Sequence, residues 1–168
     1  LDQLWQPEIL EHAIFLVTWL NWQIQIFFFW RWDSMNCIYL NKYNKSLRKL
    51  NLTSNRISTL TSTSFTKALT KNLEILDLKS NRLKQTLDFK KLLNIDQQQQ
   101  RQVKSANFES LKYLDLSNNR YTRIVSLAFK NCMKLQFLDL SRNRVFLIED
   151  GAFYVLGERK LYDVVIDL

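Results

Sequence analysis

The apolar residues of this chain recur in a fixed order. A leucine is followed three residues later by a second leucine and two residues after that by a third, with polar residues around them. The order is shared by the strings LRKLNLTSNRI, LEILDLKSNRL, LKYLDLSNNRY and LQFLDLSRNRV, which begin at Leu47, Leu73, Leu111 and Leu135. Alternation of apolar and outward residues is typical of a short β-strand with one buried face. We therefore predict one strand in each string.

The strings follow one another at a nearly constant spacing. A fifth, LYDVVIDL, begins the same order at Leu161, and the starts are evenly spaced except for one longer step, from Leu73 to Leu111. An insertion at about 90–107 accounts for that step. A single unit of this length cannot bury its leucines, whereas stacked units bury a continuous core and pair their strands in parallel. The pattern predicts a repeat domain over 47–168, with an irregular lead-in at 35–46 and a last repeat that is cut short.

These strings resemble the leucine-rich repeat, L-x-x-L-x-L-x-x-N-x-L. The second halves of the units also agree, because small-aromatic pairs lie at equal offsets from the repeat starts at Ser64-Phe65, Ala128-Phe129 and Ala152-Phe153. This resembles the typical subtype of about 24 residues that is common in extracellular and cell-surface proteins. The resemblance implies an α/β repeat solenoid, a curved right-handed coil with a parallel β-sheet on its concave face and mostly irregular or short helical convex segments.

An asparagine follows each expected strand, where the chain turns inward and leaves backbone groups unpaired. An amide side chain both donates and accepts hydrogen bonds, so a stacked column of amides satisfies those groups. The resemblance implies that this column is the structural asparagine ladder of the family, formed by Asn55, Asn81, Asn119 and Asn143.

Outward strand residues are expected to form columns on the concave face. One column holds Lys49, Ile75, Tyr113, Phe137 and Asp163, and the next holds Asn51, Asp77, Asp115, Asp139 and Val165. An arginine lies just past each strand, at Arg56, Arg82, Arg120 and Arg144. We interpret an apolar patch of Ile75, Tyr113 and Phe137, flanked by the aspartates and arginines, as a protein-binding face. Alternatively, the aspartate and arginine columns belong to the repeat consensus and neutralise one another.

The segment 1–34 is hydrophobic and separate from the repeats. Ala13 to Trp30 is an uncharged stretch, and its length just reaches the threshold for a membrane-spanning helix. Polar Asn21, Gln23 and Gln25 in its middle oppose that interpretation, and acidic rather than basic residues precede it, unlike a signal peptide. Three alternatives remain open, namely a membrane segment at 13–30, a buried or irregular amphipathic segment, and sequence foreign to the protein.

The composition narrows the chemistry. The formal net charge is +8, which favours anionic partners such as sulfated glycans, acidic proteins or nucleic acid, with nucleic acid the least favoured of them. Alternatively, the basic residues form a solvated, charge-rich surface with no partner of this kind. The one histidine, His12, lies outside the repeats, so they hold no histidine-based triad or metal cluster. No phosphate-binding glycine loop occurs. We expect Cys132 to be a small core residue, and we predict no enzyme activity, cofactor or metal.

The expected function is that of a non-catalytic protein-binding module in cell-surface or extracellular recognition, such as a fragment of a receptor ectodomain. Two candidate N-glycosylation sites, at Asn44 and Asn51, agree with that location. The alternatives are an intracellular, cytoplasmic scaffold or adaptor and a matrix protein that binds sulfated glycans.

Overall fold

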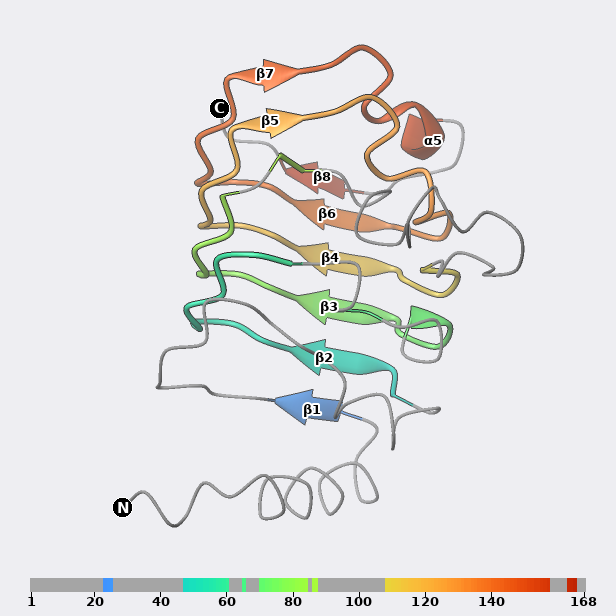
Figure 1. Cartoon of the computed structure of the whole chain (residues 1–168). Coiled ribbons are helices and arrows are strands. Elements are labelled where there is room, and N and C mark those ends of the chain that lie inside the picture. Colours follow the sequence, from blue (N-terminus) through green and yellow to red (C-terminus); the bar gives the residue numbers. More distant parts are fainter. Residues whose placement is uncertain are drawn as a thin grey trace, which may run out of the picture.

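A computed structural model describes residues 23–25, 47–60, 65, 70–84, 86–87, 108–157 and 163–165. Its main element is a six-stranded sheet in which every neighbouring pair is parallel. In sheet order the strands are β1 (Gln23–Gln25), β2 (Lys49–Asn51), β3 (Ile75–Asp77), β4 (Tyr113–Asp115), β6 (Phe137–Asp139) and β8 (Asp163–Val165). Figure 1 shows them stacked one above another, so the predicted repeat solenoid is confirmed.

The register of the sheet follows the repeated strings. Leu50, Leu76, Leu114, Leu138 and Val164 pair in one row. The four leucines of this row are 0% exposed, as are the leucines two residues further on, Leu52, Leu78, Leu116 and Leu140. β3 and β4 pair in the same register as the other strands, although the insertion places their strings further apart in the sequence. The long unit therefore keeps the strand order of the short ones.

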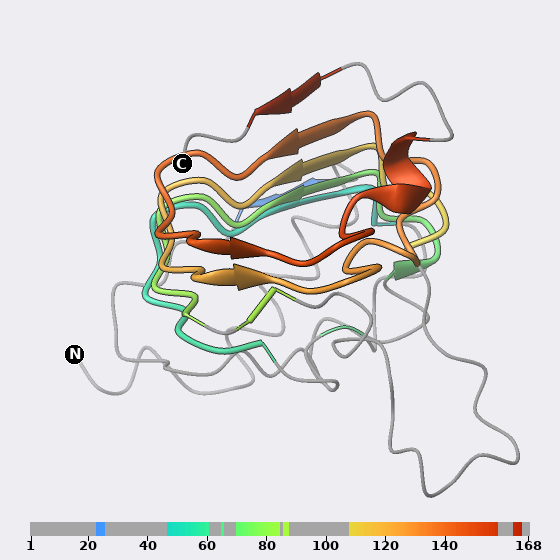
Figure 2. The same cartoon turned by 90° about the horizontal axis from the view of Figure 1, so that it is seen from above.

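A second, smaller layer closes the coil. β5 (Arg123–Ile124) pairs in parallel with β7 (Leu147–Ile148), and Leu87 forms an isolated bridge to Ile124. Figure 1 shows β5 and β7 running opposite to the large sheet, and Figure 2 shows them facing it across the interior. Among the described residues, this side also contains turns and the four-residue helix α5 (Tyr154–Gly157), as expected for mostly irregular or short helical convex segments.

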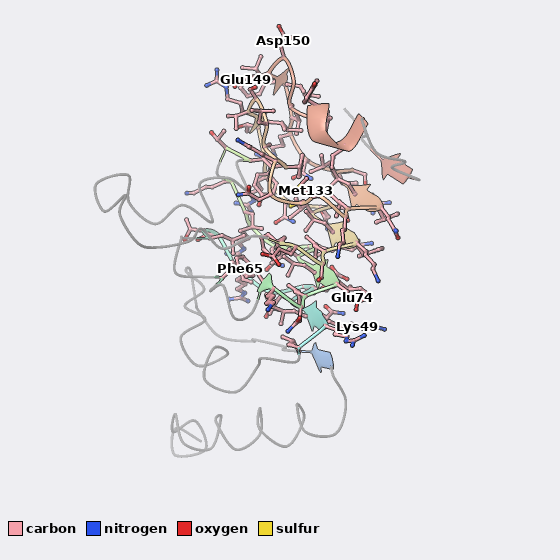
Figure 3. All side chains as sticks on the ribbon, turned by 90° about the vertical axis from the view of Figure 1, so that its right-hand side faces the viewer. Lys49, Phe65, Glu74, Met133, Glu149 and Asp150 are labelled. Carbon is pink, nitrogen blue, oxygen red and sulfur yellow. The ribbon has the colours of Figure 1, made fainter. Side chains whose placement is uncertain are left out.

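Aromatic rings fill the space between the two layers. Phe65 meets Phe108 edge to face at 5.5 Å between ring centroids, and Phe129 stacks on Phe153 at 5.7 Å. Phe65 is 1% exposed, and Figure 3 shows Phe65 and Lys49 on opposite sides of the strands, Phe65 to the left and Lys49 to the right. Cys132 is 0% exposed, which confirms its place in the core, and burial raises the pKa of its thiol to about 12.

The asparagines after the strands join consecutive repeats. The Nδ2 of Asn119 donates to the carbonyls of Leu116 in its own repeat and Leu78 in the preceding one, both at 3.0 Å. Its Oδ1 accepts from the backbone N–H of Leu83 at 3.1 Å. Asn81 and Asn143 make equivalent contacts. Each of these amides thus satisfies buried backbone groups of two repeats.

The residue before each of these asparagines has a left-handed backbone. The positive φ angles are 58° at Ser54, 56° at Ser80, 51° at Asn118 and 55° at Arg142. This conformation costs an L-residue free energy, except that asparagine and glycine adopt it more readily. Its recurrence at one position turns the chain sharply inward and aims the following amide at the strand ends.

The hydrophobic stretch 13–30 contains β1 at its described residues. Gln23–Gln25 are extended and pair with β2, with Ile24 opposite Leu50. A single membrane-spanning helix through the whole stretch is therefore wrong at these residues. The physical reason is the repeat itself, because Ile24 and Ile26 precede Leu50 and Leu52 by one repeat length and have the same spacing. The prediction missed this repeat because the asparagine and first leucine of the motif are replaced.

Within the part of the chain that the structure describes, no helix combines the length and apolar character that crossing a membrane requires. The lead-in at 35–46, the insertion at 90–107, the remainder of 1–34 with His12, and Asn44 lie outside the described residues.

Removal of one ladder amide should destabilise the fold strongly. Asn119→Ala leaves buried backbone groups without partners, at about 1–3 kcal/mol each, so we expect the free energy of unfolding to fall by about 3 kcal/mol in urea denaturation followed by circular dichroism. The matched control is Asn118→Gly, at a φ of 51° that glycine accepts. It removes an exposed amide that donates to the Ser80 hydroxyl at 2.9 Å and not to buried backbone groups. An equal loss in both variants would contradict the ladder's role.

Candidate protein-binding face

The outward column of the sheet brings the three predicted apolar residues together. Ile75, Tyr113 and Phe137 pair directly across β3, β4 and β6, and each is half-buried. The rings of Tyr113 and Phe137 stack at 4.3 Å between centroids, with 3° between their planes. Exposed Lys49 pairs with Ile75 at one end of the column, and Asp163 pairs with Phe137 at the other. We call Ile75, Tyr113 and Phe137 the apolar column.

The neighbouring aspartates hold the ends of the strands. The Oδ1 atoms of Asp77, Asp115 and Asp139 accept from the backbone N–H two residues further on, at 3.0, 2.9 and 2.8 Å. Asn51 accepts from Thr53 in the same way at 2.9 Å. These are Asx turns, a local contact that short polar side chains form readily. The column of Asn51 and the aspartates therefore stabilises the backbone, a role that the sequence interpretation missed. The sequence signal for this role is the polar residue that recurs just before the third leucine of each repeat.

Asp115 departs from the expectation that all three aspartates are available on the protein-binding face. It is 4% exposed, and its Oδ1 also accepts from the Ser117 hydroxyl at 2.6 Å. A buried carboxylate needs such donors to offset its lost hydration. Asp77 and Asp139 are only half-buried and stay within reach of a partner.

The aspartates give the face a negative local potential. Burial raises the pKa of Tyr113, and the carboxylates of Asp115, Asp77 and Asp139 raise it further. A neighbouring negative charge opposes formation of the phenolate, because two like charges would then lie close together. The stacked aromatic pair therefore lies beside a group of anions.

The four arginines do not lie in the strands of the sheet. Arg56, Arg82, Arg120 and Arg144 are all exposed and follow the asparagines in the turn that leaves the sheet. The described ion pairs join Glu74 to Arg48 at 3.3 Å, Glu74 to Lys112 at 2.9 Å, and Arg123 to Glu149 at 3.2 Å. Among the described residues, none of these pairs links an arginine of the turn to an aspartate of the face. The described ion pairs therefore do not support the alternative that the two columns neutralise one another.

Glu74 connects three repeats through residues that directly precede the strands. The hydrogen bond from Lys112 lowers its pKa, and Lys112 and Arg48 add favourable charge. Its two partners are about half exposed, so the pairs contribute little to stability. Figure 3 shows Glu74 and Lys49 on the sheet side of the molecule.

Within the described ranges, no three His, Cys, Asp or Glu side chains are placed to hold a metal ion. Asn51, a candidate glycosylation site, is half-buried in β2, and its Oδ1 already accepts from Thr53. The chemistry that this face offers is therefore contact through rings, carboxylates and one terminal lysine.

The negative potential around Tyr113 can be tested by titration. Asp139→Asn keeps an oxygen for the Ser141 N–H and removes the charge, so we expect the pKa of Tyr113 to fall, as measured from ¹³C chemical shifts of its labelled ring against pH. The control is Asp150→Asn, at an exposed residue that Figure 3 places at the far end of the described repeats from Lys49. An unchanged Tyr113 midpoint in Asp139→Asn, or an equal fall in both variants, would rule out this origin.

Comparison with known proteins agrees with the repeat geometry. A family model described as leucine rich repeat matches residues 86–145 and, in an overlapping placement, 109–156. A second model with the same description matches residues 43–59. A search of curated proteins finds no match. The matched segments together cover more than half of the 168 residues, and domains built from this repeat commonly bind proteins. The chain belongs to the leucine-rich-repeat proteins.

Proposed function

We propose that this protein is a recognition module that binds another protein on its concave face, with the apolar column as the anchor. The observation that carries the proposal is the stacked pair of Tyr113 and Phe137, which remains partly open to solvent on the outer side of the sheet. Aromatic rings supply a large contact area at low entropic cost, and interfaces are enriched in them. The core does not need these rings, because the leucines on the other side of the sheet already fill it.

The charges around the apolar column favour a particular partner surface. Asp77 and Asp139 flank it as half-buried carboxylates, and Tyr113 lies within their field. A partner that presents an apolar side chain to the rings and a lysine or arginine to the carboxylates would match both features. Exposed Lys49 at the end of the column would repel the same cation, so it would help to fix the partner's position along the sheet.

A comparison of two phenylalanines tests the proposal. Phe137 is half-buried in the stack, whereas Phe146 is 80% exposed and lies off the sheet. Proteins captured from cells by the wild-type chain should bind Phe137→Ala at least about tenfold more weakly, a cost above roughly 1 kcal/mol, when dissociation constants are measured by biolayer interferometry. Phe146→Ala should bind with unchanged affinity.

Circular dichroism and thermal unfolding of both variants separate lost contact from lost fold. Unchanged binding by a folded Phe137→Ala, or greater weakening by Phe146→Ala, would place the partner on another surface.

We further propose that recognition takes place at the cell surface or outside the cell. The two sequons and the typical repeat length support this location, and an intracellular scaffold is the alternative. The protein expressed in mammalian cells from its full reading frame should gain electrophoretic mobility after treatment with peptide N-glycosidase. Because the Asn51 amide is half-buried and engaged by Thr53, the shift should disappear in Asn44→Gln and persist in Asn51→Gln. A wild-type protein with no shift would favour the intracellular scaffold.

A further inference from the structure

A row of exposed basic side chains follows the turn beyond the sheet. Its members are Arg56, Arg82, Arg120 and Arg144, with Lys84 and Arg142 beside them, and we call these six residues the basic edge. All six are exposed. The row spans four consecutive repeats, with one arginine directly after the ladder asparagine that follows each of β2, β3, β4 and β6, and it does not belong to the apolar column.

The backbone fixes the spacing of this row. The N–H groups of Arg82, Arg120 and Arg144 donate to carbonyls of the preceding repeat, at Ile57, Leu83 and Tyr121, over 2.8–2.9 Å. Each arginine also follows a ladder asparagine directly. Neighbouring parallel strands lie about 4.8 Å apart, so the four arginine backbones are held at about that interval over roughly 15 Å.

The charge of the row is not neutralised within the described part of the molecule. The ion pairs there use Arg48, Lys112 and Arg123, and none uses a member of the basic edge. The nearest acidic residues in sequence, such as Asp77 and Asp139, direct Oδ1 to backbone N–H groups. Guanidinium groups held close together without counter-charges repel one another, and an external polyanion would relieve that repulsion.

We propose that the basic edge binds a linear sulfated polysaccharide. A guanidinium fork donates two parallel hydrogen bonds to two oxygens of an oxyanion such as sulfate, which a lysine ammonium cannot do. A row at an even interval matches a polymer that carries charges along its length. Because all six side chains are exposed, the polymer would lie across several repeats without displacing a buried side chain.

Nucleic acid fits this edge less well. Single strands gain much of their binding from aromatic platforms on which successive bases stack. Among described residues within three positions of these arginines, the exposed aromatic ring is Phe146, in the last of the four repeats only. Sequence-specific recognition of a duplex needs an element that enters a groove, and an edge of turns does not provide one.

The test is binding of the full chain to immobilised heparin, with variants matched in charge. Arg120→Glu/Arg144→Glu should elute at clearly lower salt than wild type and bind in solution at least tenfold more weakly. Lys130→Glu/Lys134→Glu makes the same change of charge at exposed residues away from the edge, and it should elute close to wild type. Arg120→Gln/Arg144→Gln provides a milder edge variant, and thermal unfolding of all variants checks the fold.

The polymer and the surface are then tested separately. Desulfated heparin should not retain the protein, and a single-stranded oligonucleotide of similar charge should bind more weakly than heparin. Equal losses in the edge and control variants would show attraction by net charge alone, and stronger binding of the oligonucleotide would identify nucleic acid instead; either result overturns the proposal. Phe137→Ala should bind heparin as wild type does, so this test is independent of protein binding on the concave face.

Discussion

The hydrogen bonds of the buried asparagine amides are the constraint on which the rest of this structure depends. Where the chain leaves each strand, carbonyls such as those of Leu78 and Leu116 point into an interior that water does not reach, and an unpaired carbonyl there would cost about 1–3 kcal/mol. Asn119 joins both of them. Because one amide serves two repeats, it fixes their distance and register together, and the leucines can pack only in that register.

Once the turn is fixed, each position of the repeat has a defined environment. The leucines are buried, the asparagine closes the turn, and the preceding aspartate holds the strand end by an Asx turn. In the described structure, the outward column has side chains that do none of these things, namely those of Lys49, Ile75, Tyr113 and Phe137. Its side chains differ from repeat to repeat while the leucines and asparagines stay the same. The positions that are free to vary are therefore the ones that give the face its own chemistry.

The register of the columns could be predicted because the strand period and the repeat period are both visible in the letters. Alternation places Tyr113 and Phe137 on the same face, and alignment of the repeats places them side by side, as the strands pair. The burial of Asp115 could not be predicted in this way, because it depends on the Ser117 hydroxyl and on the local turn. β1 was missed because isoleucines replace leucines there and no asparagine follows.

Phe108 illustrates another limit. Counted forward from Leu73, it lies just past the insertion at 90–107, so no repeat position is assigned to it. Counted back from Leu111 it lies three residues before the repeat start, as Cys132 does before Leu135. Thr70 lies at the same place before Leu73, and all three of these residues are buried. Phe108 also contacts Phe65. The repeat positions that follow an insertion can therefore be assigned only by counting back from the start of the next repeat.

The same turn also separates charges of opposite sign. The aspartates before it lie with their carboxylates toward the strand ends, whereas the arginines after it lead away from the sheet. In this order the aspartates beside Tyr113 lie in the strands, and the arginines of the basic edge lie in the turns a few positions further on. A cationic group directed to the sheet and an anionic polymer along the edge would not compete for one site. The two proposed binding surfaces thus lie on either side of one repeated turn, whose ladder amide is committed to the backbone.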